Sequence, residues 1–132
     1  MYKHTQIFLL LIFFALAGCS QSNDLPSGSD TRTFDSLVWQ DKSSVQSDDN
    51  GISEREKMLK DLVENILPQK TESEIENLLG KSLETAYFKS LDKDMIYYLG
   101  PERDNFMNID SEWLLIWLDD SGKFKEYRVV ND

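Results

Sequence analysis

Six consecutive apolar residues at 113–118 form the strongest local pattern in the chain. Acidic residues bound the run, and the turn signal Asp120-Ser121-Gly122 follows it. A run of this length is too short for a free-standing helix and suits a β-strand. With a period of two it divides into two faces, Trp113, Leu115 and Trp117 against Leu114, Ile116 and Leu118. Because neither face is polar, the pattern predicts an inner strand with both faces at least partly covered.

Two weaker strand patterns flank this run. Residues 95–99 are β-branched and aromatic and end at Gly100-Pro101, and residues 102–110 read as a polar loop. Residues 124–130 alternate, with Phe124, Glu126 and Arg128 expected opposite Lys125, Tyr127 and Val129. The sequence therefore predicts an antiparallel meander whose last two strands form a hairpin. Residues 83–89 fit either a strand or an irregular bridge.

Two capped helices precede the strands. Ser53 to Glu56 fits a capping box, an apolar stripe with helical spacing follows, and Pro68 ends it. Thr71 to Glu74 repeats the capping box, and Gly80 stands where a left-handed C-terminal cap is expected. Helices followed by a meander predict an α+β domain at 52–132, with two short helices packed on a three-stranded antiparallel sheet.

A polar segment at 19–51 separates this domain from the chain's N-terminal region. It is rich in Ser, Asp, Asn, Gln and Gly, a composition typical of a disordered tether. An island at 33–39, containing Phe34 and Trp39, interrupts it. We expect this island to dock on the edge of the domain, because a lone tryptophan in a linker is costly to expose.

The first 18 residues have the pattern of a secretory signal peptide. A short polar start with Lys3 precedes the apolar run at 7–16 and the small residues Ala17-Gly18. The apolar run spans roughly 15–18 Å as a helix, which is too short to cross a bilayer of ~30 Å. Leu16-Ala17-Gly18-Cys19 resembles the lipobox of bacterial lipoproteins. The resemblance implies lipidation of Cys19, with acyl chains such as palmitate, and removal of the signal peptide.

The residues after Cys19 bear on the membrane that the lipid enters. Ser20-Gln21 lacks the aspartate that resembles the inner-membrane retention signal. This favours the outer membrane, with the domain facing the periplasm.

Composition narrows the function. The net charge of −10 argues against nucleic acid and against attraction to anionic lipid headgroups. Cys19 is the only cysteine, and the only histidine, His4, lies in the signal peptide, so the processed chain cannot build a Ser-His-Asp or Cys-His arrangement. The oxygen-rich stretch 48–51 does not match the spaced pattern of a calcium loop. We expect no metal, no cofactor and no enzymatic activity.

The order of these elements resembles the SmpA/OmlA (BamE-like) family of small outer-membrane lipoproteins, which includes an accessory subunit of the β-barrel assembly machinery. The matching positions are Thr71, Glu74, Ile75, Leu78, Leu79, Gly80, Trp113, Leu115, Ile116, Gly122 and Lys123. Gln69-Lys70 stands where the family usually has a glycine before the capping threonine. The resemblance implies two helices on a three-stranded sheet and a place in envelope assembly. The same fold is similar to β-lactamase inhibitor proteins.

These observations favour a membrane-anchored scaffold that binds a protein partner in the envelope. The aromatic residues Trp113, Trp117, Tyr97 and Tyr98 are the candidate contacts, provided that some are exposed as a patch. The alternative is an inhibitor of a secreted or periplasmic hydrolase, which would present a projecting loop at 100–110.

Overall fold

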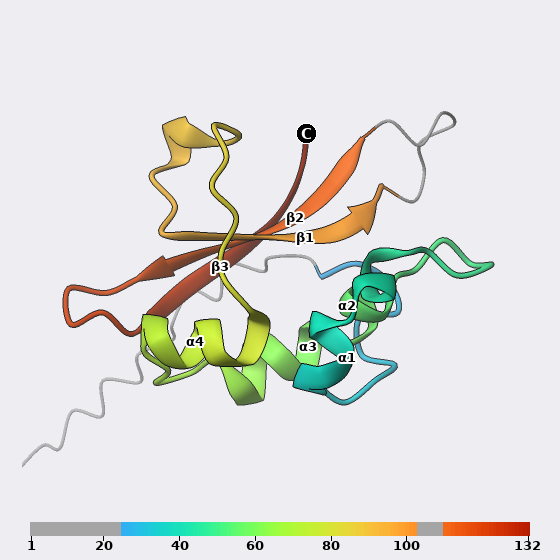
Figure 1. Ribbon diagram of the computed structural model, residues 1–132, viewed down its shortest axis with the longest axis horizontal. Coiled ribbons are helices and arrows are strands. Elements are labelled where there is room, and N and C mark those ends of the chain that lie inside the picture. Colours follow the sequence, from blue (N-terminus) through green and yellow to red (C-terminus); the bar gives the residue numbers. More distant parts are fainter. Residues whose placement is uncertain (1–24, 103–109) are drawn as a thin grey trace, which may run out of the picture.

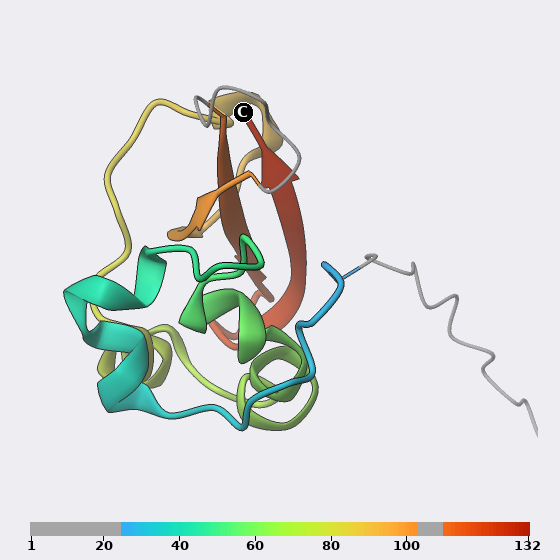
Figure 2. The ribbon, with the colours of Figure 1, turned by 90° about the vertical axis from the view of Figure 1, so that its right-hand side faces the viewer.

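A three-stranded antiparallel sheet with short helices on one face forms the body of the protein (Figures 1 and 2). The computed structural model describes residues 25–102 and 110–132. The elements are α1 (Ser36–Gln40), η1 (Lys42–Val45), α2 (Glu54–Lys57), α3 (Leu59–Asp61), η2 (Leu62–Ile66), α4 (Glu72–Leu79), η3 (Lys89–Leu91), β1 (Met95–Pro101), β2 (Ser111–Leu118) and β3 (Phe124–Asn131). The predicted α+β fold class is confirmed.

The helical region after Ser53 is irregular. The Ser53 hydroxyl accepts a hydrogen bond from the backbone N–H of Glu56 (3.1 Å), as expected of an N-cap. The region then passes through α2, α3 and the π-helical turn η2, in which the N–H of Leu67 donates to the carbonyl of Leu62 (2.9 Å). Pro68 follows directly, where helical geometry is disfavoured. The predicted single helix is thus a succession of short helical turns.

The capping box of α4 forms as predicted. The N–H of Glu74 donates to the Thr71 hydroxyl (3.3 Å), and the Glu74 carboxylate accepts from the N–H of Thr71 (3.1 Å). Gly80 ends the helix with a φ of 84°. Ile75 and Leu79 on its inner face are buried in the core.

A tight turn between η2 and α4 places Gln69 in the left-handed region, with a φ of 69°. The N–H of Lys70 closes this turn on the carbonyl of Leu67 (3.0 Å). A side chain at positive φ costs of order 1 kcal/mol, and glycine avoids that cost. This position therefore has the backbone geometry that a glycine would favour.

β2 is the inner strand, as predicted, and its two faces differ. Leu114 and Ile116 face the helices and belong to the main core, whereas Trp113 and Leu115 belong to a second apolar cluster. The main core is formed by these buried side chains: Trp39, Met58, Leu59, Leu62, Val63, Leu67, Ile75, Leu79, Met95, Tyr97, Leu99, Leu114 and Ile116. Burying such side chains contributes roughly 1.5–3 kcal/mol each and is the main source of stability.

A β-bulge changes the predicted alternation of β3. Trp117 pairs with Glu126 but Leu118 pairs with Phe124, so Lys125 is the extra residue. The bulge turns Phe124 toward the helices, where it packs against the main core together with Tyr127. The prediction that Phe124 shares a face with Glu126 is therefore wrong.

The folded body begins well before residue 52, which corrects the predicted end of the tether at residue 51. Residues 36–45 form α1 and η1, and Asp35 caps α1 by accepting hydrogen bonds from two backbone N–H groups. Trp39, from the island at 33–39, has no exposed surface and lies at the centre of the main core. The composition of the flanking residues is that of a linker, but Trp39 and the partly buried Leu25, Phe34 and Val38 supply the apolar surface that orders them.

Arg55 connects three parts of the chain around Trp39. Its guanidinium lies over the Trp39 ring, 4.9 Å from the centroid, and its Nε donates to the Trp39 carbonyl (2.9 Å). Its Nη1 donates to the Tyr98 carbonyl on β1 (2.8 Å). The neighbouring Ser53 hydroxyl donates to the Leu99 carbonyl (2.6 Å). These bonds tie α1 and α2 to the outer edge of β1.

Replacing Trp39 with alanine should lower the free energy of unfolding by about 3–5 kcal/mol, the usual cost of removing a buried tryptophan. Leu37→Ala is the matched control, because Leu37 lies on the same helix and is 85% exposed. It should change stability by less than about 0.5 kcal/mol. Urea unfolding of the two variants and the wild type measures both values. Equal, small effects would mean that residues 33–39 are not part of the folded body.

Replacing Gln69 with glycine should raise the free energy of unfolding by about 0.5–1 kcal/mol, because it relieves the left-handed strain. Gln69→Ala keeps the Cβ atom and should give no gain. Comparing the urea midpoints of the two variants isolates the backbone effect. A glycine variant less stable than the alanine variant would contradict it.

Candidate protein-docking surface

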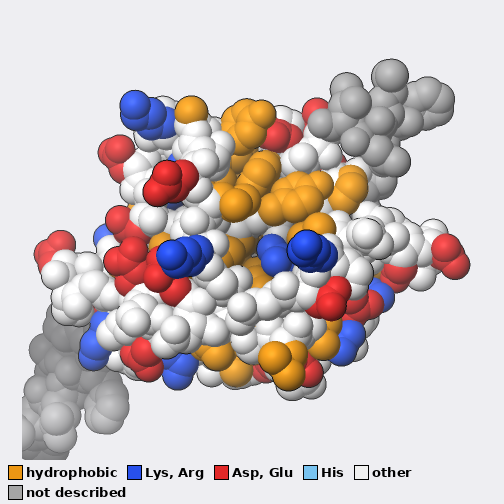
Figure 3. Space-filling model, viewed as in Figure 1, with side chains coloured by type: hydrophobic (Ala, Val, Ile, Leu, Met, Phe, Trp, Pro, Cys, Tyr) orange, Lys and Arg blue, Asp and Glu red, His pale blue; other side chains and the backbone are white. Residues whose placement is uncertain are grey.

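Tyr87, Tyr98, Trp113 and Trp117 form an aromatic patch on the sheet face opposite the helices. The Trp113 ring lies 5.1 Å from that of Tyr98 and 5.9 Å from that of Tyr87, at interplanar angles of 57° and 45°. Tyr87 is 55% exposed, Tyr98 and Trp117 are half-buried, and Trp113 is 8% exposed. Hydrophobic side chains also gather at the surface above the helices in Figure 3. The patch thus has a buried centre and a partly open rim.

The connection 81–94, between α4 and β1, covers part of this face. Phe88 and Leu91 pack against the second apolar cluster, and the Trp117 indole N–H donates to the Leu91 carbonyl (3.1 Å). Phe88 and Asp92, on either side of η3, have φ values of 57° and 51°. Left-handed geometry at a bulky residue costs of order 1–3 kcal/mol and persists only where the surroundings enforce it. Packing of Phe88 and Leu91 on the sheet supplies that enforcement and leaves the Tyr87 ring at the surface.

Charged groups frame the patch. The Arg128 guanidinium lies over the Trp117 ring, 5.2 Å from its centroid. The Trp113 indole N–H points to the carboxylate of Asp132, at 3.4 Å. The Lys93 ammonium donates to the Tyr87 carbonyl (2.6 Å). An apolar centre with a rim of both charge signs is the usual anatomy of a protein–protein contact surface.

Three of the four predicted contact residues lie together on this face, and the fourth does not. Tyr97 points the other way, because neighbouring strand residues alternate between faces. It is 2% exposed, and its hydroxyl donates to the Gly80 carbonyl (2.8 Å). Burial raises the pKa of Tyr97 well above its usual range. The prediction of Tyr97 as a partner contact is therefore corrected: it belongs to the main core.

Sequence reasoning missed Tyr87 and Arg128. Tyr87 lies in residues 83–89, where the sequence left the local structure open, and its position depends on the turn at η3. The alternation of the last strand placed Arg128 on the face opposite Tyr127, but its contact with Trp117 depends on the register between β2 and β3. The aromatic dipeptide Tyr87-Phe88 was the available signal, with one ring exposed and the other packed inward.

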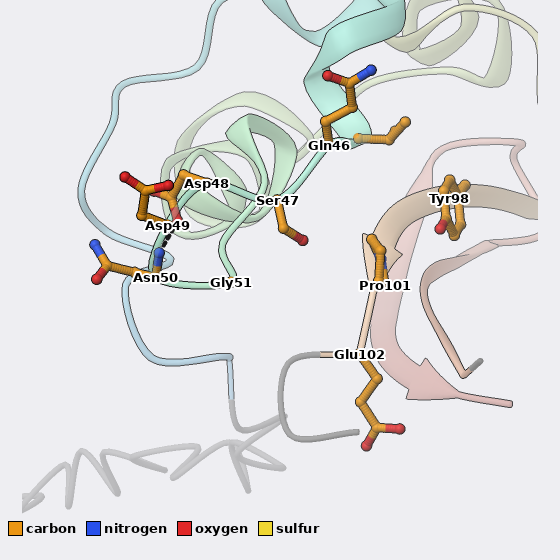
Figure 4. A pocket seen from close by; sticks show the side chains of 10 residues that line it. Gln46, Ser47, Asp48, Asp49, Asn50, Gly51, Tyr98, Pro101 and Glu102 are labelled. Atoms are coloured by element: carbon orange, nitrogen blue, oxygen red, sulfur yellow. Dashed lines mark hydrogen bonds between the residues drawn. The ribbon is translucent and has the colours of Figure 1, made fainter. Parts of the chain in front are cut away.

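A polar groove of about 760 Å³ adjoins the patch, between residues 45–51 and the end of β1 (Figure 4). Tyr98 lines both, together with Pro101 and Glu102 on the β1 side. The groove holds the oxygen-rich stretch 48–51 that the sequence analysis singled out. The Asp48 carboxylate accepts from the backbone N–H groups of Asn50 (2.8 Å) and Ile52 (3.0 Å) and pairs with Lys57 (3.0 Å). The Asp48 carboxylate therefore stabilises the loop to which it belongs.

Several predictions fall outside the described residues. Cys19 and most of the loop 100–110, namely residues 103–109, are among them. Within 25–102 and 110–132, no group of three or more His, Cys, Asp or Glu side chains is arranged to hold a metal ion. Over the same ranges, every helix is too short or too polar to traverse a bilayer.

Comparison with known proteins found no match: no protein-family model, no curated protein and no solved structure resembles this chain significantly.

The hydrogen bond from the Ile52 backbone, with that from the Lys57 side chain, lowers the pKa of Asp48 from 3.8 to about 2. A carboxyl group whose pKa is lower in the folded state stabilises the fold above its unfolded pKa, and this contribution disappears as pH falls from about 4 to 2. Asp48→Asn should therefore lower the melting temperature at pH 6 and make little difference at pH 2.

Asp49→Asn is the matched control for this pH series, because it removes the same charge from the neighbouring, exposed position. Calorimetric melting of the three proteins between pH 2 and 7 measures the effect. A difference between wild type and Asp48→Asn that stays constant over this range would contradict the assignment.

Proposed function

We propose that this protein is a membrane-anchored lipoprotein whose domain binds a protein partner in the cell envelope without catalysing a reaction, in outer-membrane assembly or maintenance. The anchor is the lipidated Cys19, and the membrane is the outer membrane, with the domain on the periplasmic side. The docking surface is the aromatic patch. The proposal combines two features, the lipobox near the N-terminus and the aromatic patch on the domain.

The lipobox residues Leu16 to Cys19 support the anchor. Each buried methylene of an acyl chain contributes ~0.8 kcal/mol, so two or more chains hold a protein firmly on a membrane. Processing at Cys19 also removes His4, and the chain has no other histidine. The processed protein lacks the side chain most often used for general acid–base catalysis near neutral pH. Contact, rather than chemistry, is therefore the proposed basis of function.

The local geometry near α4 supports kinship with the SmpA/OmlA family. The capping box at Thr71–Glu74 and the positive φ of Gly80 fall on the positions that carry the resemblance. Gln69 adopts the backbone conformation that suits the glycine usually found there in the family. A role beside the β-barrel assembly machinery is the specific form of the proposal that this kinship suggests.

The single observation that carries the docking role is the exposure of Tyr87 over the half-buried and buried rings of Tyr98 and Trp113. Rigid aromatic side chains lose little conformational entropy on binding and dominate the energetics of most interfaces. Phe88 and Leu91 pack against the cluster that includes Trp113 and so fix the connection that carries Tyr87. Tyr87 is thus an anchor residue that a partner can reach without rearrangement of the domain.

Replacing Tyr87 with serine should reduce recovery of the partner about tenfold, which corresponds to the loss of ~1.4 kcal/mol at a contact hot spot. The full lipidated chain is purified from detergent-solubilised envelope, and β-barrel assembly subunits are quantified by mass spectrometry. The same spectra determine whether Cys19 carries acyl chains. Recovery of those subunits with the wild type and their loss with Tyr87→Ser is the expected result.

Leu37→Ser is the matched control, since Leu37 is an exposed apolar residue on the helical side of the molecule. It should leave recovery unchanged. Equal recovery with Tyr87→Ser and wild type would eliminate the aromatic patch as the docking surface. Specific recovery of a hydrolase in place of assembly subunits would favour an inhibitor.

A further inference from the structure

Asn50 and Gly51 form the only Asn-Gly pair in the chain. In such a pair the backbone nitrogen of the glycine attacks the side-chain carbonyl carbon of the asparagine, because glycine has no side chain that obstructs the approach. A cyclic succinimide forms and ammonia leaves. Water then opens the ring and yields aspartate or isoaspartate, a reaction that makes asparagine one of the thermolabile residues.

The pair lies in a loop that Asp48 holds through both its carbonyl and its carboxylate. The Gly51 N–H donates to the Asp48 backbone carbonyl (2.9 Å). One oxygen of the Asp48 carboxylate accepts from the N–H groups of Asn50 (2.8 Å) and Ile52 (3.0 Å), the residues on either side of Gly51. The other oxygen pairs with the Lys57 ammonium (3.0 Å). Figure 4 shows the bond from the Asn50 backbone to Asp48 as a dashed line, with the exposed Asn50 side chain pointing away from the groove.

These contacts oppose closure of the succinimide ring in two ways. The Gly51 nitrogen becomes a nucleophile only when it loses its proton, and without that proton it cannot donate to the Asp48 carbonyl. The Asp48 carboxylate is also held against the two neighbouring N–H groups, so a negative charge on the Gly51 nitrogen would form beside a like charge. The turn therefore keeps Gly51 in an unreactive state.

We propose that Asn50 is a site of spontaneous conversion to aspartate and isoaspartate, and that Asp48 sets the rate by holding Gly51 in the unreactive turn. In the first step the Gly51 nitrogen bonds to the Asn50 Cγ atom and the Cγ–Nδ2 bond breaks. The proton from Gly51 and the Nδ2 group leave together as ammonia. Hydrolysis of the ring at Cγ gives aspartate, and hydrolysis at the Asn50 backbone carbonyl gives isoaspartate.

The conversion changes the polar groove beside the aromatic patch. Residues 45–51 line this groove, and Tyr98 lines it and also belongs to the patch. Both products carry a carboxylate, which adds a negative charge to a loop that already holds Asp48 and Asp49. Isoaspartate also lengthens the main chain by a methylene group. The converted protein therefore has a more acidic groove with an altered loop.

Peptide mapping of the purified protein by mass spectrometry, after incubation at mildly alkaline pH, measures the conversion. Replacement of the amide by a carboxyl group raises the mass of the peptide, and isoaspartate separates from aspartate by chromatography. Asp48→Ala removes the acceptor of two hydrogen bonds and should speed the conversion about tenfold. Asp49→Ala is the matched control, because it removes the same charge from the neighbouring exposed position, and it should convert at the wild-type rate.

Two further proteins complete the test. The wild type unfolded in urea gives the rate without the turn and should convert faster than the folded protein. Asp48→Asn keeps an acceptor oxygen but not the charge, so it should convert at an intermediate rate, and it keeps the comparison valid should the alanine variant unfold.

Three results would overturn the proposal. A folded wild type that converts as fast as the unfolded chain would show that the turn is reactive. Equal rates for the Asp48 and Asp49 variants would remove the role of Asp48. A peptide containing Asn50 that gains no mass even in urea would eliminate the site itself.

Discussion

The burial of one indole ring, that of Trp39, makes the segment before residue 52 part of the folded domain. The ring packs edge-on against Tyr97 at 6.4 Å, tilts against Phe34 at 6.1 Å and lies beneath the Arg55 guanidinium. The Ser44 hydroxyl and Arg55 both donate to its carbonyl. A polar segment that could not order itself is thereby made part of the core.

The two faces of the sheet carry two separate clusters of apolar residues. One face of β2 completes the core under the helices, and the other supports a smaller cluster whose aromatic rim reaches solvent. The connection 81–94 covers only part of that second face, at the cost of left-handed backbone at Phe88 and Asp92. The main core and the proposed docking surface therefore share strand β2, and the buried face of the strand holds the aromatic patch in place. A preformed surface of this kind loses little entropy on binding.

Local patterns in the sequence predicted the three strands and α4, whereas features that depend on tertiary packing were not predictable from them. The period of two at 113–118 assigned both faces of β2, and the threonine box assigned the start of α4. The bulge at Lys125, which reverses Phe124, has no signal in an alternating run of side chains. Nor could composition show that Trp39 enters the core, because its neighbours are those of a linker.

For the candidate site, too, local patterns predicted some features and tertiary packing decided the others. Alternation correctly grouped Trp113 with Trp117, but the sequence offered Tyr97 and Tyr98 together although strand geometry separates them. Tyr87 depends on a 3₁₀ turn flanked by two residues with positive φ, and ordinary propensities do not indicate such a turn. The sequence therefore indicated that β2 carries the aromatic patch, but it did not indicate the most exposed ring of the patch, that of Tyr87.

Native-state hydrogen exchange at the Trp39 amide is the most direct measurement of the central claim. This N–H donates to the Asp35 carbonyl at 2.9 Å inside a helix whose tryptophan side chain has no exposed surface. If the segment is an integral part of the core, the amide exchanges only by global unfolding, as slowly as the amide of Leu114 in β2. Exchange at the rate of an unstructured chain, while Leu114 stays protected, would show that residues 25–51 are a tether and would contradict the account.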